Sequence, residues 1–273
     1  MFRWDLKRSQ LSVSTRALSR DLKDAIGAAA RAGFASIEVW EEDTEQMGGY
    51  RTAARLIKDS GLRISSYQVI RNVDGVDADC FAEALRLSTS LIDHAAEIGA
   101  DSVLACSSLH PSVSFDEALA QDQLGAIAGI AAAANMPLAF ECLSMASHRA
   151  LWTQAWTLIK AVNNPILGLA LDTTHSAIMN EDMEAVRAIP ATSIGFVQLA
   201  DLRTTAGDVF DLNRRQRLFP GEGSLDLEPF MAAVLATGYT GTVSLEVFNA
   251  DNMQRSADDN ATRAMASFKR AAP

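Results

Sequence analysis

Two hydrophobic patterns alternate along the chain. Short apolar runs rich in Val, Ile and Leu are followed by longer Ala-rich stretches, whose apolar residues recur at the spacing of one helix face. The runs predict strands at 11–14, 36–39, 63–67, 102–105, 137–141, 167–171, 194–199 and 242–247. The stretches predict helices at 20–32, 46–60, 78–98, 115–134, 151–162, 183–188, 227–236 and 257–269.

This alternation predicts a parallel sheet with right-handed crossovers. Eight strand–helix units in 273 residues favour a single closed (β/α)8 TIM barrel over an open sheet, with 1–273 as one domain. Several predicted helices end in Gly directly before a strand, where a left-handed C-terminal residue is needed: Gly33, Gly61, Gly99 and Gly238. No linker or low-complexity stretch divides the chain.

Polar side chains follow the last four predicted strands. Glu141, Asp172, Gln198 and Glu246 each come at the carboxyl end of an otherwise apolar run. Because barrel enzymes place their catalytic groups at that end, these side chains are expected to converge. Converging carboxylates repel one another, and a divalent cation is the usual compensation. The donors are all oxygens, which suits Mg2+ or Mn2+ better than Zn2+.

Each of these residues has an alternative interpretation when taken alone. Asp172 is a favoured type of helix N-cap, and Glu141 or Glu246 alone is compatible with a rim residue paired with an arginine. His175, three residues after Asp172, is compatible with a loop histidine that has no catalytic role. The repetition on four consecutive strands favours the metal site.

Composition and charge narrow the function classes. The formal net charge of −10 disfavours nucleic acid as a partner, and no apolar run approaches the ~20 residues of a membrane span. The first ten residues lack the apolar core of a secretory signal, and three cysteines form no CxxC pair, so a cytoplasmic protein is expected. A homodimer is compatible with a barrel of this size.

Short motifs at the strand ends carry a more specific signal. They are Glu38-Val39-Trp40-Glu41-Glu42-Asp43, Gln68-Val69-Ile70-Arg71-Asn72, Cys106-Ser107-Ser108, Glu141 with His148, Asp172-Thr173-Thr174-His175, Val197-Gln198-Leu199-Ala200-Asp201, Arg217 with Phe219-Pro220-Gly221-Glu222-Gly223, and Ser244-Leu245-Glu246-Val247-Phe248-Asn249. Nearly end to end, the chain resembles the xylose-isomerase-like barrel superfamily of sugar isomerases and epimerases. Within it, the chain is most similar to the bacterial 3-dehydroshikimate dehydratases, above all in Gln198 and in the Glu-Val-Phe-Asn ending.

The resemblance implies that one divalent metal is held by Glu141, Asp172, Gln198 and Glu246, the same four residues that the strand ends indicate. It further implies dehydration of 3-dehydroshikimate to protocatechuate. A metal that chelates the ketone and the neighbouring hydroxyl would stabilise the enediolate formed on proton loss, after which a hydroxyl leaves as water.

Roles for the remaining residues follow as hypotheses. His175 is the first candidate for proton transfer and His148 the second, with Glu141 as a ligand that also takes part in catalysis. Arg71 and Arg217 are expected to bind the substrate carboxylate. The alternative for these arginines is a salt bridge with Asp74 or Glu222. Glu38 and Gln68 complete the expected substrate-binding set.

The chain departs from the dehydratase pattern at several positions expected to lie near the substrate. Asn72 stands in place of the usual Asp, Glu42 in place of Asn, Glu222 in place of a frequent Gln, and 145–147 in place of a Trp-Gly-Arg run. Two other functions therefore stay open. A metal-dependent sugar or keto-polyol isomerase or epimerase shares the first half of the reaction, and a non-catalytic barrel that binds metal or sugar needs only the ligands.

Overall fold

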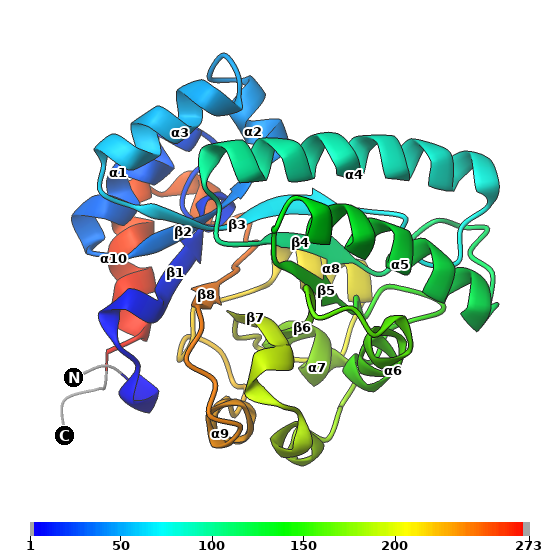
Figure 1. Ribbon diagram of the computed structural model, residues 1–273. Coiled ribbons are helices and arrows are strands. Elements are labelled where there is room, and N and C mark those ends of the chain that lie inside the picture. Colours follow the sequence, from blue (N-terminus) through cyan, green and yellow to red (C-terminus); the bar gives the residue numbers. More distant parts are fainter. Residues whose placement is uncertain (1–2, 270–273) are drawn as a thin grey trace.

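A computed structural model describes residues 3–269 and contains a closed barrel of parallel strands, as predicted (Figure 1). Its strands follow one another around the barrel in chain order: β1 Leu11–Ser14, β2 Ser36–Trp40, β3 Arg63–Ile70, β4 Val103–Cys106, β5 Leu138–Glu141, β6 Leu167–Asp172, β7 Ile194–Leu199 and β8 Val243–Leu245. β8 pairs with β1 and closes the sheet. A closed sheet leaves no unpaired edge.

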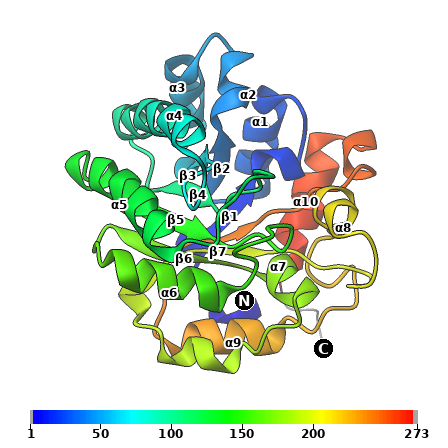
Figure 2. The same ribbon diagram turned by 90° about the vertical axis from the view of Figure 1, so that its right-hand side faces the viewer.

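The helices surround the barrel (Figure 2). They are α1 Leu22–Ala32, α2 Glu41–Glu45, α3 Tyr50–Asp59, α4 Ala78–Ile98, α5 Glu117–Ala133, α6 Trp152–Val162, α7 Thr173–Ile178, α8 Val209–Arg215, α9 Glu228–Ala236 and α10 Ala257–Ser267. No helix in the described part of the chain is long and apolar enough to cross a membrane.

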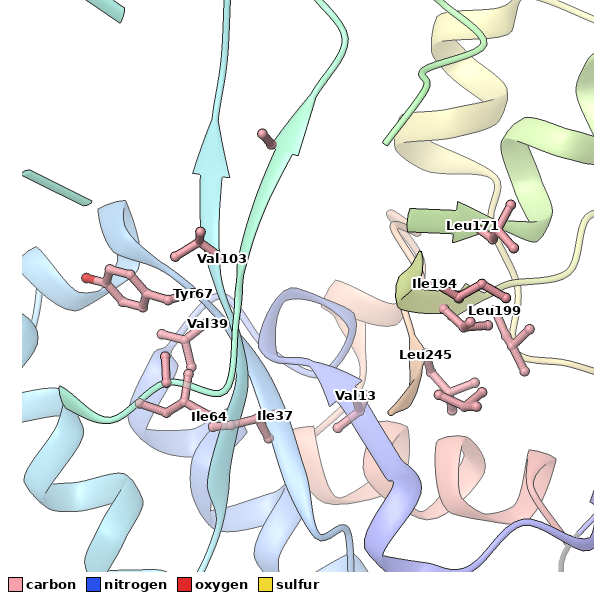
Figure 3. Close-up of a cluster of buried hydrophobic side chains, with 14 of the residues drawn as sticks. Val13, Ile37, Val39, Ile64, Tyr67, Val103, Leu171, Ile194, Leu199 and Leu245 are labelled. Atoms are coloured by element: carbon pink, nitrogen blue, oxygen red, sulfur yellow. The ribbon is translucent and has the colours of Figure 1, made fainter. Parts of the chain in front are cut away.

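Side chains on each strand alternate between two environments. Val13, Ile37, Val39 and Leu245 point outward and pack in the large apolar cluster between strands and helices (Figure 3). The positions between them point into the barrel, where a smaller apolar cluster contains Leu104, Cys106, Ala139, Leu143, Ala146, Ala170 and Phe196. Because of this alternation, the inward-facing residues at the carboxyl ends of the strands lie at the mouth of the barrel.

The structure differs from the predicted helices in three places. The helix expected at 46–60 begins only at Tyr50, because Gly48 and Gly49 adopt positive φ values of 84° and 100° before it, and a separate short helix that was not predicted, α2, precedes these glycines. The helix expected at 183–188 is a 3-10 helix, Glu184–Ala188. The short helices α7 and α8, both at the mouth, were not predicted.

The long segment after β7 folds back over the barrel and is tied down by one carboxylate. Asp201 accepts hydrogen bonds from the backbone N–H groups of Leu202, Gly221, Gly223 and Leu225. Its own backbone pairs with that of Leu218. The segment thereby carries α8 and Arg217 to the mouth.

Candidate active site

The four predicted metal ligands meet at the carboxyl end of the barrel. Asp172 and Gln198 are directly paired across β6 and β7, and the Glu246 N–H donates to the Leu199 carbonyl at 3.2 Å. Glu141 ends β5, the next strand along. All four side chains belong to residues that are at most 4% exposed. The strand ends therefore create one buried, oxygen-rich cluster.

Arg217 lies in the middle of this cluster rather than at its rim. Its Nη1 is 2.8 Å from Asp172 Oδ2 and 3.0 Å from Glu246 Oε2. Its Nε and Nη2 donate to the backbone carbonyl and the side-chain oxygen of Asn213 on α8. The guanidinium, at 2% exposure, is thus committed to the protein's own carboxylates.

One guanidinium does not neutralise this much negative charge. Burial, together with the charges of Glu246 and Asp172, raises the pKa of Glu141 well above its ordinary value. Burial and the charge of Asp172 likewise raise the pKa of Glu246 to about 7, against the opposing effect of Arg217. Burial also acts to raise the pKa of Asp172, but Arg217 and His175 outweigh it and the net shift is downward. The raised pKa values therefore favour protons on Glu141 and Glu246, and a bound cation would replace these protons.

The donor atoms of the cluster fit a metal ion. One donor atom each from Glu141, Asp172 and His175 lies within 4.8 Å of the others, and all three residues are buried. Glu141 Oε1 and Gln198 Oε1 are buried and make no hydrogen bond. A buried oxygen without a partner is costly unless a ligand completes it. Glu246 lies outside the compact trio, although Arg217 links it to Asp172.

Asp172 serves both as the N-cap of a helix and as a member of the carboxylate cluster. Its Oδ1 accepts from the N–H groups of Thr174 and His175 and so caps α7. Its Oδ2 bonds to Arg217. The cap holds the carboxylate in place and starts the helix that carries His175 into the cluster.

His175 is held by the loop after β5. The backbone N–H of Ser144 donates to His175 Nδ1 at 3.1 Å, and the Ser144 hydroxyl lies 2.9 Å from the same atom. In the neutral ring the hydrogen is therefore on Nε2, which lies 3.5 Å from Glu141 Oε1. Burial lowers the pKa of His175 to about 4, so the ring is neutral at physiological pH.

A cavity of about 230 Å³ opens above the cluster. Its lining includes four residues of the cluster, which we call its floor: Glu141, His175, Arg217 and Glu246. The lining also includes residues from the surrounding loops, which we call its upper wall: Arg16, Trp40, Arg71, Leu109, Met145, Asn213, Arg214 and Phe248. Trp40 lies under two guanidinium groups, since the Cζ of Arg16 is 4.1 Å and that of Arg71 5.5 Å from the ring centroid. The cavity thus combines an anionic floor with a cationic, aromatic upper wall.

Two arginines of this wall have no carboxylate partner among residues 3–269. Arg71 lies over the Trp40 ring and makes no ion pair, and Arg214 on α8 makes none either. The carboxylates considered as alternative partners are already used, because Asp74 pairs with Arg149 and Glu222 pairs with Arg263. Both unpaired guanidinium groups are therefore free to meet an anionic ligand.

Glu38 and Gln68, expected to contact substrate, lie deeper than the cavity. Both are at most 1% exposed, and neither belongs to the cavity lining formed by the described residues. Glu38 Oε2 accepts a hydrogen bond from Gln198 Nε2 at 2.8 Å. The structure therefore favours a role for Glu38 through Gln198 rather than through substrate.

His148 also differs from its expected place at the proton-transfer site. Its ring packs edge-on against Phe115 at 4.7 Å, and its Nε2 lies 3.0 Å from Arg149 Nη2 and 3.4 Å from Glu117. It is not part of the cavity wall within residues 3–269. Its neighbour Arg149 makes a buried ion pair with Asp74 that joins the loops after β3 and β5.

Comparison with known proteins places this site in a family. The family model described as xylose isomerase-like TIM barrel matches residues 26–271. The chain belongs to this family. A curated relative from Pseudomonas putida, named 3-dehydroshikimate dehydratase, is 35% identical over 241 residues, which is 88% of this chain and 38% of the relative. The chain therefore spans well under half of that relative's length.

Two solved structures are similar to this barrel. A fusion of a xylose isomerase-like TIM barrel with a 4-hydroxyphenylpyruvate dioxygenase superposes with a TM-score of 0.90 at 34% identity, covering 94% of this chain and 42% of that one. The IOLI protein, solved with a zinc atom, has a TM-score of 0.83 at 17% identity and covers 94% and 96% of the two chains. The second likeness concerns the fold alone.

Some site residues have no clear signal in the sequence. Arg16 is placed by its ion pairs with Glu42 and Asp43, and Asn213 and Arg214 by the unpredicted helix α8. Ser144 follows an apolar strand and has no pattern of its own. The one sequence signal for such residues is a polar Ser or Asn in a loop after a barrel strand, and this signal is weak.

Proposed function

We propose that this chain is a divalent-metal-dependent lyase that removes water from a small cyclic hydroxy-ketone acid, with 3-dehydroshikimate as substrate and protocatechuate as product. The observation that carries the proposal is the arrangement of the cavity. An oxygen-rich cluster with unpartnered buried oxygens forms its floor, and unpaired arginines lie on its upper wall. The name of the Pseudomonas putida relative supports the choice of substrate.

The metal would be held by Glu141, Asp172, Gln198 and Glu246, and Mg2+ or Mn2+ suits these oxygen donors. When bound, it would supply Lewis-acid polarisation of the substrate ketone, which acidifies the neighbouring C–H. Arg217 holds Asp172 and Glu246 in register and limits their repulsion.

His175 acts as a neutral hydrogen-bond donor in this proposal. The Ser144 N–H fixes Nδ1 as an acceptor, so the hydrogen on Nε2 points toward Glu141 and the cavity floor. A neutral imidazole can stabilise negative charge on a substrate oxygen, as buried histidines of lowered pKa do. In this proposal the Nε2–H donates a hydrogen bond to the departing hydroxyl without giving up its proton. Glu141, whose Oε1 makes no hydrogen bond, takes the proton lost from the C–H and returns it to that hydroxyl, which leaves as water.

Arg71 and Arg214 bind the substrate carboxylate. Arg217, expected from the sequence to share this role, is already paired with two carboxylates, and Arg214 replaces it in the proposal. A guanidinium matches a carboxylate through two parallel hydrogen bonds. The Trp40 ring beneath Arg71 keeps that guanidinium facing the cavity.

The test is incubation of the purified protein with 3-dehydroshikimate and Mn2+ or Mg2+, followed by the absorbance of the aromatic product. We expect product formation that EDTA abolishes and added metal restores. His175→Ala should lose most of the activity, whereas His110→Ala, which alters a histidine outside the cavity lining, should retain it. Absence of product with either metal, together with interconversion of ketoses, would replace the lyase by an isomerase.

A further inference from the structure

One buried carboxylate at the mouth has no part in the proposed reaction. Glu38, on β2, is fully buried, and its nearest polar partner on the ligand cluster is Gln198. It faces inward from the barrel wall, across from the strands that bear the other ligands. Burial of a carboxylate is costly, so the short hydrogen bond between Glu38 and Gln198 requires an explanation.

Gln198 has a problem of orientation that carboxylate ligands do not have. A carboxylate offers two equivalent oxygens, whereas an amide offers one oxygen and one NH2 group, and only the oxygen can bind a cation. Glu141, Asp172 and Glu246 lie in the same cluster, and in the absence of metal their oxygens attract N–H donors. Left to itself, the Gln198 amide would turn its NH2 toward these carboxylates and its oxygen away.

The structure has the opposite orientation. The NH2 group of Gln198 points to Glu38 Oε2 at 2.8 Å, and Gln198 Oε1 stays buried without a hydrogen bond. We propose that Glu38 is a positioning residue, which holds the Gln198 amide with its oxygen turned toward the metal. This inference rests on the proposed role of Gln198 as a ligand.

The same carboxylate extends its effect to the substrate wall. Both polar atoms of the Gln68 amide make hydrogen bonds in one orientation, in which Nε2 donates to Glu38 Oε2 at 3.3 Å and Oε1 accepts from Trp40 Nε1 at 2.9 Å. Trp40 in turn supports the guanidinium of Arg71. Glu38 therefore orients two amides, one directed at the metal and the other at the wall that carries the anion-binding arginine.

The inference is tested by calorimetric titration of the metal-free protein with Mn2+, without substrate. Glu38→Gln can still accept from Gln198 in one of its two amide orientations, so Mn2+ should bind about tenfold more weakly. Glu38→Met removes the acceptor altogether and should weaken binding by about a hundredfold. Thermal melts followed by circular dichroism confirm that each variant is folded.

A paired substitution separates orientation from damage to packing. In the double variant Glu38→Gln/Gln198→Glu the hydrogen bond is restored with its polarity reversed, and a carboxylate oxygen still faces the metal. Affinity for Mn2+ should return to within about threefold of the wild type, because the hydrogen bond that orients the side chain at position 198 is remade. Asp74→Asn, which neutralises an equally buried carboxylate away from the ligands, should leave Mn2+ affinity unchanged.

Each outcome bears on a different claim. A wild-type protein that binds no Mn2+ or Mg2+ would overturn the proposed function itself. A wild type that binds Mn2+, with Glu38→Gln and Glu38→Met binding as tightly or weakened equally, would overturn the positioning role. A double variant as weak as Glu38→Gln alone would overturn it as well, since the reversed hydrogen bond would then have restored nothing.

Discussion

Arg217 provides the sharpest test of the electrostatics of the cluster. Its guanidinium, buried with Asp172 at 2.8 Å and Glu246 at 3.0 Å, is the one cation that contacts these two carboxylates among residues 3–269. Arg217→Met keeps much of the side-chain volume but leaves two buried carboxylates without a countercharge. Breaking a buried ion pair in this way costs about 3–5 kcal/mol.

The loss should be visible in thermal and urea unfolding of the metal-free protein at pH 7. With about 2–4 °C per kcal/mol for a domain of this size, the melting temperature should fall by roughly 6–20 °C. The matched control is Arg263→Met, which breaks the half-exposed pair with Glu222 and should cost at most about 1 kcal/mol.

Added Mn2+ should then reduce the difference in melting temperature between Arg217→Met and the wild type. The cation neutralises the same carboxylates, and in the variant it no longer competes with a guanidinium for Asp172 and Glu246. A deficit no larger than that of Arg263→Met would refute the idea that Arg217 balances the cluster. A deficit that Mn2+ leaves untouched would refute the idea that metal and guanidinium act on the same carboxylates.

Three further predictions concern other residues. Arg71→Ala and Arg214→Ala should each raise KM for a carboxylated substrate in steady-state kinetics, and unaltered KM in both would remove the anion-binding role. Glu246→Gln should weaken Mn2+ binding in calorimetry, and unchanged affinity would exclude it as a ligand. Burial raises the pKa of Glu181 from 4.5 to about 7, so the folded state loses stability as pH rises from about 4.5 to 7, and the loss is complete above 7. Glu181→Gln should therefore gain about 1 kcal/mol in urea unfolding at pH 8, allowing for the partial exposure of Glu181, and nothing at pH 4. An equal effect at both pH values would contradict this.

The barrel and the convergence of the strand-end side chains were predictable because both depend on local patterns. Apolar runs mark the strands, and the two-residue alternation of a strand fixes that Asp172 and Gln198 face inward together. The closing of the barrel then brings Glu141 and Glu246 to the same end. No tertiary information beyond the fold class is needed for this convergence.

Other parts of the site depend on contacts that no local pattern encodes. The helix α8, which carries Arg214, is only seven residues long and lies in a segment without clear hydrophobic periodicity. The place of His148 is decided by Arg149, whose partner Asp74 lies on another loop. The sequence can indicate that an arginine lies near a site, but the tertiary structure decides which carboxylate it pairs with, as the ion pairs of Arg217 with Asp172 and Glu246 show.

Asp201 gives the mouth of the barrel a property that bears on recognition kinetics. By gathering the backbone N–H groups of Leu202, Gly221, Gly223 and Leu225, it immobilises the loop when the protein folds. Ordering a residue costs about 1–2 kcal/mol, and here that entropy is lost before any ligand arrives. The mouth is thus a preformed binding site. A ligand can bind with side-chain adjustments alone, and the loop backbone does not have to become ordered on binding.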